Sequence, residues 1–107
     1  MSLYEKRAYA VQVGKMPEVV KLYRDEGFPA LKAGGFDAKL VGYFISDTGP
    51  LHQLVHLWKF DDDADRRAHW KGVFADAAFM KFAGQLRPLL LSQEVQLLNP
   101  APWGPHP

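Results

Sequence analysis

A single histidine lies within an otherwise largely apolar stretch of the chain. His56 occupies the middle of LVHLWKF, residues 54–60, which has the composition of a buried β-strand. Because a buried polar group without a hydrogen-bond partner costs about 1–3 kcal/mol, His56 needs a partner inside the protein. An imidazole in such surroundings can hold a structural hydrogen bond, or it can exchange a proton with a bound molecule.

The candidate partners of His56 come from the N-terminal segment, where polar and aromatic residues alternate with alanine. Glu5, Arg7 and Tyr9 share one face of a strand, and Ala8 and Ala10 lie on the other. Small alanines suit the close packing of a helix. We therefore expect Glu5, Arg7 and Tyr9 to lie on the face of the sheet that carries no helices, together with His56.

This arrangement predicts a ligand pocket in which His56 acts as the catalytic acid or base. The ligand-binding side chains would be Glu5, Arg7, Tyr9, Trp58 and Glu94. Arg7 could bind an anion while His56 moves a proton. The competing interpretation is structural, because an Arg–Glu pair with a hydrogen-bonded histidine would equally satisfy charges inside a dimer. We expect Arg66 and His69, on a later helical segment, to be solvated.

Other kinds of site are not indicated. His52 and His56 lie on one strand, where a rise of about 3.3 Å per residue separates them by about 13 Å, too far to share a metal. The chain has no cysteine, which excludes disulfides and thiol catalysis and is compatible with a reducing, cytoplasmic location. It has no phosphate-binding glycine-rich loop. We expect neither a metal nor a cofactor.

The overall composition is that of an ordinary folded domain. The chain has 107 residues, 48% hydrophobic and 23% charged, with a formal net charge of +1. This balance gives no basic surface for nucleic acid, and no apolar run reaches the roughly 18 residues needed to cross a bilayer. We divide the chain into one domain, residues 1–99, and a proline-rich extended tail, residues 100–107. Trp103 in this tail could anchor to the domain or to a partner.

The expected elements follow the order β-α-β-β-α-β. Alternation and residue type predict four strands, at residues 3–13, 39–46, 51–60 and 90–98. One helical segment begins near Pro17 and is interrupted at Gly27 and Pro29. The other begins after Asp61–Asp63 and is capped again at Asp76. This order predicts a ferredoxin-like α+β domain, with a four-stranded antiparallel sheet, helices on one face, and the first and third strands at the centre.

Both faces of the predicted sheet are apolar. Along the third strand the apolar side chains point to both sides, Leu51, Val55 and Leu57 to one and Leu54, Trp58 and Phe60 to the other. Since the helices cover one face, the second face needs another cover. The simplest cover is a second copy of the chain, packed sheet to sheet around a two-fold axis. We therefore expect a homodimer or a higher multiple of it.

Several motifs resemble those of the NIPSNAP family. They are the opening ExRxYxVxxGKxPE from Glu5 to Glu18, then Gly42-Tyr43-Phe44, Gly49-Pro50, His56-Leu57-Trp58, an aspartate-rich segment that ends at Arg66, and the close LLSQEVQLLNPAPWGP. The resemblance covers nearly the whole chain and implies a small bacterial member. It also implies a dimeric α+β barrel, in which two ferredoxin-like protomers bring their sheets together.

The resemblance implies a fold more firmly than an activity. The wider barrel superfamily includes cofactor-free monooxygenases, isomerases, haem-degrading enzymes and ligand-sensing domains, and the fold does not choose among them. We expect a protein that binds a small molecule in a polar-lined pocket. The alternatives are a cofactor-independent monooxygenase or isomerase that uses His56, and a non-enzymatic structural or interaction protein whose tail docks a neighbouring chain.

Overall fold

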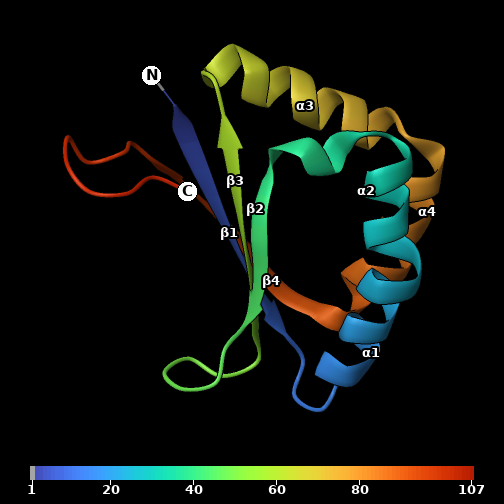
Figure 1. The fold of residues 1–107 in the computed structure, drawn as a ribbon. Helices are drawn as coiled ribbons and strands as arrows, with labels where there is room; N and C mark the ends of the chain where they lie inside the picture. The colour runs from blue at the N-terminus through green and yellow to red at the C-terminus, as the bar shows by residue number, and fades with distance from the viewer. Residues whose placement is uncertain (1) are drawn as a thin grey trace.

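A computed structural model describes residues 2–107, and Figure 1 shows one sheet with all its helices on one side. The elements are β1 (Leu3–Val11), α1 (Met16–Leu22), α2 (Phe28–Ala33), β2 (Leu40–Ile45), β3 (Gln53–Phe60), α3 (Asp63–Ala75), α4 (Ala77–Leu86) and β4 (Leu90–Leu98). The strand order is β2-β3-β1-β4, and each neighbouring pair is antiparallel. The ferredoxin-like α+β class and the central position of the first and third strands are confirmed.

The strand limits follow the turns between them. Gly14 has a φ of 83°, and β1 ends before it, at Val11. The connection from β2 to β3 contains Gly49 with a φ of 73° and His52 with a φ of 59°. A left-handed residue does not continue a strand, so β3 begins at Gln53, two residues later than expected. Among residues 2–107, no helix is long and apolar enough to span a membrane.

The first helical segment is continuous, contrary to the expected interruption at Gly27 and Pro29. Residues Tyr23–Gly27 form a π-helical turn that joins α1 to α2, and the Phe28 N–H donates to the Tyr23 carbonyl. Pro29 lies just after the π-helical turn, where the hydrogen-bond pattern of the helix changes and its missing N–H is tolerated. Gly27 packs on Phe82, where an added Cβ would lie 2.5 Å from the ring. The absence of a side chain at Gly27 therefore lets this segment pack closely against α4.

The second helical segment is divided as expected. The Asp62 side chain accepts a hydrogen bond of 2.8 Å from the Asp65 N–H at the start of α3. Asp76 has extended backbone angles, and its side chain accepts a bond of 2.9 Å from the Phe79 N–H at the start of α4. The change of direction at Asp76 lets both helices pack over the same face of the sheet (Figure 1).

The two faces of the sheet differ in what covers them. The helix-covered face supplies the buried core, with Tyr9, Val11, Leu54, Trp58 and Phe60 on the strands. The helix-free face carries a row that crosses all four strands, from Glu94 through Ala8 and Val55 to Phe44. Phe44 is 57% exposed at the end of this row. The helix-free face therefore has an apolar centre, as expected, that no helix covers.

The tail after β4 makes an excursion away from the sheet and returns to it (Figure 1). The Tyr4 hydroxyl donates to the carbonyl of Pro107, which brings the end of the chain back to β1 on the helix-free face. Trp103, within this tail, is 75% exposed. Trp103 therefore does not anchor the tail to the domain.

Candidate functional site

The predicted site residues of β1 lie on the helix-covered face, so their expected placement on the helix-free face is wrong. Arg7 is paired with His56 and Glu5 with Trp58, and all four side chains point toward the helices. The alanines point the other way. The physical reason is that large aromatic side chains, and a cavity between them, separate the helices from the sheet. The helix-covered face of β1 therefore does not need small residues.

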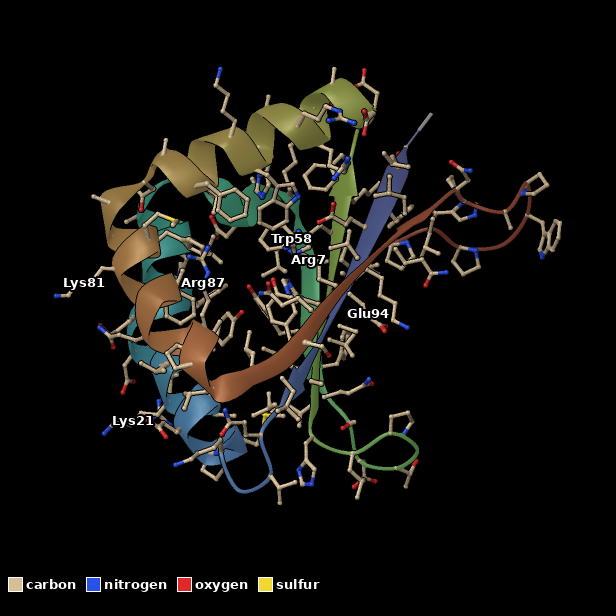
Figure 2. The ribbon with its side chains drawn as sticks, turned by 180° about the vertical axis from the view of Figure 1, so that it is seen from behind. Arg7, Lys21, Trp58, Lys81, Arg87 and Glu94 are labelled. Atoms are coloured by element: carbon tan, nitrogen blue, oxygen red, sulfur yellow. The ribbon has the colours of Figure 1, made fainter. Side chains whose placement is uncertain are left out.

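His56 is surrounded by aromatic rings. The Tyr43 ring stacks on it with centroids 4.9 Å apart, and the Tyr9 ring meets it edge-on at 4.8 Å. The Trp58 Nε1–H donates to His56 Nδ1 over 2.7 Å. The predicted proximity of Arg7, Tyr9, His56 and Trp58 is therefore found, and Figure 2 shows Arg7 and Trp58 pointing into the space between sheet and helices.

The hydrogen bond from Trp58 defines which nitrogen of His56 carries the proton. Since Nδ1 accepts, the proton of the neutral ring lies on Nε2. Nε2 is buried and has no hydrogen-bond partner among the residues that the structure describes. Burial and the positive charge of Arg7 lower the pKa of His56 from 6.5 to about 3. Near neutral pH this side chain is therefore an uncharged donor with a free N–H.

Arg7 supplies a second group of donors beside His56. Its Nε donates to the Tyr9 hydroxyl over 2.9 Å, and its Nη1 bonds to Glu5 over 3.2 Å. Neither bond uses Nη2. The guanidinium also lies 4.5 Å from the centre of the Trp70 ring, within the range of a cation–π contact. These contacts hold the positive charge in one place on the wall of the cavity.

Two residues expected to be solvated belong to this part of the core. Arg66 donates to Glu5 over 2.9 Å, so the fully buried Glu5 carboxylate bridges arginines from β1 and α3. His69 is 9% exposed and packs on Trp58 and Trp70. The signal was present in the sequence, because positions 66, 69, 70 and 73 form one helical stripe, which includes the large apolar residues Trp70 and Val73.

Glu94 does not join the site, which corrects its predicted ligand-binding role in this pocket. It is paired with Ala8, whereas the neighbouring Val95 is paired with Arg7. Alternation therefore directs Glu94 to the helix-free face, where it is exposed, and Figure 2 shows it on the far side of the sheet from the helices. A shift of one residue in register is enough to move a side chain to the other face.

An inner cavity of about 20 Å³ lies between the sheet and the helices. Arg7, Tyr9, His56 and Trp58 line it, together with Tyr23 and Tyr43, which were not predicted to belong to the site. Burial raises the pKa of both tyrosines, so their hydroxyls stay protonated. Within the described residues its lining contains no carboxylate. The cavity is thus rich in hydrogen-bond donors and suits an oxygen atom that accepts them.

The comparisons with known proteins agree with this fold. The chain is 33% identical to a NIPSNAP family protein with unknown function from Agrobacterium tumefaciens, over 97% of this chain and 92% of that chain, with a TM-score of 0.89. It is 35% identical to an uncharacterized NIPSNAP domain protein from Burkholderia xenovorans, over 97% of this chain and 99% of that chain, with a TM-score of 0.87. An antibiotic biosynthesis monooxygenase shares the fold, with 16% identity and a TM-score of 0.64 over 94% of this chain and 99% of that chain.

No curated protein matches the chain, so these comparisons assign no activity. The family model for NIPSNAP matches residues 4–105, which include both helical segments, all four strands except the first residue of β1, and most of the tail. The motif residues Arg7, His56 and Trp58 therefore lie within the matched region. From this match we conclude that the chain belongs to the NIPSNAP family.

Proposed function

We propose that this protein binds a small molecule through a carbonyl or carboxylate oxygen, held by His56 and Arg7 in the inner cavity. The observation that carries this proposal is the buried Nε2–H of His56, which has no acceptor within residues 2–107. A buried donor without a partner costs about 1–3 kcal/mol, which a ligand oxygen would recover. Arg7, on the same wall, supports a negatively charged oxygen.

The lowered pKa of His56 favours hydrogen-bond donation over acid–base catalysis. With a pKa of about 3, the imidazole is a weak base near neutral pH and is not protonated there. A neutral histidine next to a fixed arginine instead resembles the donor groups that stabilise an oxygen carrying negative charge. We therefore propose binding as the function, in preference to a monooxygenase or isomerase that uses His56 to move protons.

Butyrate, a short carboxylate, tests the binding proposal. We expect butyrate to bind at millimolar concentrations and to change tryptophan fluorescence, because Trp58 contacts His56 at the cavity. The His56→Phe variant keeps a ring that can stack on Tyr43 but loses the donor. Its dissociation constant should rise about tenfold or more, since a hydrogen bond to a charged group contributes about 1.5–3 kcal/mol. Fluorescence titration at pH 7 measures both.

His106→Phe is the matched control, because His106 is exposed in the tail. It should bind butyrate as the wild type does. Circular dichroism of each variant separates a lost donor from a lost fold. Equal butyrate affinity in the wild type and His56→Phe would contradict the proposal, and so would the absence of butyrate binding to the wild type.

We also propose that the protein forms a homodimer through its helix-free face. Ala8 and Val55 form the apolar centre of this face; the row ends at the exposed Phe44 on one edge strand and at the exposed Glu94 on the other. Small side chains in the centre would let a second sheet approach closely. An uncovered apolar face of this kind is typical of an interface between protein chains.

A charge placed on the apolar part of this face should break the dimer. In Phe44→Asp, the new carboxylate would lose its hydration on association, so we expect a monomer at micromolar concentrations. Ile45→Asp is the matched control, because Ile45 is 52% exposed but points to the opposite face of β2. Analytical ultracentrifugation distinguishes the outcomes. A monomeric wild type, or a Phe44→Asp variant with the same mass as the wild type, would overturn the proposal.

A further inference from the structure

We propose that the ligand is amphipathic, and that its unbranched apolar tail lies in a groove between α1 and β2, beyond the inner cavity. This inference rests on the proposed function, because it requires the polar head to be held at His56 and Arg7. It adds the chemical class of the ligand, a carboxylate or carbonyl compound with an aliphatic chain. The groove is lined by Val19, Val20, Tyr23, Phe28, Ile45 and Leu54, among others.

The small volume of the inner cavity leads to this inference. At about 20 Å³ it exceeds only slightly the roughly 10–15 Å³ needed to hold one water molecule. A carboxylate or carbonyl group fits such a space, but a ring or a chain does not. The body of any ligand whose oxygen reaches His56 must therefore extend into a neighbouring space.

Two spaces adjoin the inner cavity, and they differ in size and chemistry. Toward β4, a space of about 60 Å³ is bordered by Arg87 and Gln93 as well as by apolar residues. Toward β2, the groove has a volume of about 260 Å³, and Arg24 is the only charged residue of its described lining. Because the groove is larger and almost entirely apolar, it fits an aliphatic chain better than the space near β4 does.

Tyr23 and Tyr43 stand between the inner cavity and the groove. Both residues line both spaces, and their ring centroids are 5.2 Å apart with a tilt of 55° between the rings. Tyr23 is the first residue of the π-helical turn, a departure from the α-helix that is frequent at functional sites. At this distance the two rings are in contact. A chain that joins the two spaces must therefore displace one of them, and the narrow opening this makes favours an unbranched tail.

A series of straight-chain carboxylates, from butyrate to dodecanoate, tests the inference. If the tail enters the groove, affinity for the wild type should rise about threefold with each added methylene and level off when the groove is full. In Ile45→Gln, a polar side chain replaces an apolar residue of the groove lining. The gain in affinity with each added methylene should then be at most half of the gain in the wild type. Fluorescence titration below the micelle concentration of each compound measures the dissociation constants.

Leu51→Gln is the matched control, because Leu51 is 60% exposed in the turn before β3 and does not line the groove. It should show the same rise with chain length as the wild type. His56→Phe should weaken every member of the series by a similar factor, which shows that the head binds at His56.

The outcomes separate this inference from the proposed function. If butyrate binds through His56 but affinity does not grow with chain length, the groove is not the tail site and the proposed function stands. If the rise with chain length is equal in Ile45→Gln and Leu51→Gln, the tail lies elsewhere, and the inference is wrong. If no carboxylate binds in a manner that depends on His56, the proposed function fails first.

Discussion

Acidification from pH 6.5 to about 4 should lower the free energy of unfolding steeply, because His56 and His69 are buried in their neutral forms. In the unfolded chain a histidine takes up a proton near pH 6.5, whereas in the folded protein the pKa of His56 is about 3 and that of His69 about 4. Burial is the main cause of both shifts. As the pH falls through this window, the unfolded state binds more protons and is favoured.

The sign and size of the effect follow from this difference in proton binding. Above pH 6.5 these histidines are mostly neutral in both the folded and the unfolded state, so their contribution to the free energy of unfolding does not change with pH. Below it, each histidine lowers the free energy of unfolding by about 1.4 kcal/mol per pH unit until its folded pKa is reached. For His56 alone this amounts to about 2–3 kcal/mol between pH 6 and pH 4. Urea denaturation at several pH values measures the slope.

The controls assign the slope to particular histidines. In His56→Phe, the free energy of unfolding should fall less steeply with pH, because the contribution of His56 is lost. In His106→Phe, a change in the exposed tail, the slope should be that of the wild type. Hydrogen bonds from Arg67 to Asp63 and from Lys39 to Asp65 lower the pKa of these partly exposed carboxylates below 3.8, so their protonation affects stability in a lower pH range. An equal slope in the wild type and His56→Phe would show that His56 is protonated without unfolding.

The Glu5→Gln substitution should cost about 3 kcal/mol of the free energy of unfolding at pH 7. Glu5 is fully buried and bridges Arg7 and Arg66, whose side chains are only 13% and 17% exposed. Removing one charge from a buried network leaves its partners without compensation, which typically costs about 3–5 kcal/mol. Glutamine keeps the shape and one acceptor, so we expect the lower end of this range. Urea denaturation gives the value.

Asp63→Asn is the control for Glu5→Gln, because Asp63 bonds to the same Arg66 but is half exposed. Solvent screens this outer pair, so the control should destabilise the protein much less. If both substitutions lowered the free energy of unfolding equally, the buried carboxylate would have no special role. The result also bears on the site, since Glu5 holds Arg7 at the cavity.

The sequence allowed the strands and the residues that share a face with His56 to be predicted, because both depend on local alternation. The limits of β4 and the pairing of β1 with β3 were correct for this reason. The hydrogen bond to His56 comes from Trp58 on its own strand, however, and not from the N-terminal segment as expected. Alternation shows which residues share a face, but it does not show which face the helices cover. Since both faces are apolar, the size of Ala8 and Ala10 was the remaining guide, and it led to the wrong face.

The missed residues of the site depend on features that local patterns do not express. Tyr23 reaches the cavity from a π-helical turn, whose extra residue alters the helical period, and the sequence favoured a break in the helix there. Tyr43 lies on the edge strand β2 and belongs to the site because its ring stacks on His56. By contrast, Arg66 and His69 lie on a regular stripe with Trp70, so the pattern could have placed them in the core.

The contact between Tyr4 and the Pro107 carbonyl has a topological consequence. Because this bond brings the first strand and the last described residue together, the backbone follows an almost closed path. A short peptide could join the two ends at little cost in conformational entropy. New ends could then be opened in the exposed turn at residues 47–50, which lies outside the helices and strands. The architecture of the sheet and its cavity is therefore compatible with circular permutation, in which the order of elements changes but their packing does not.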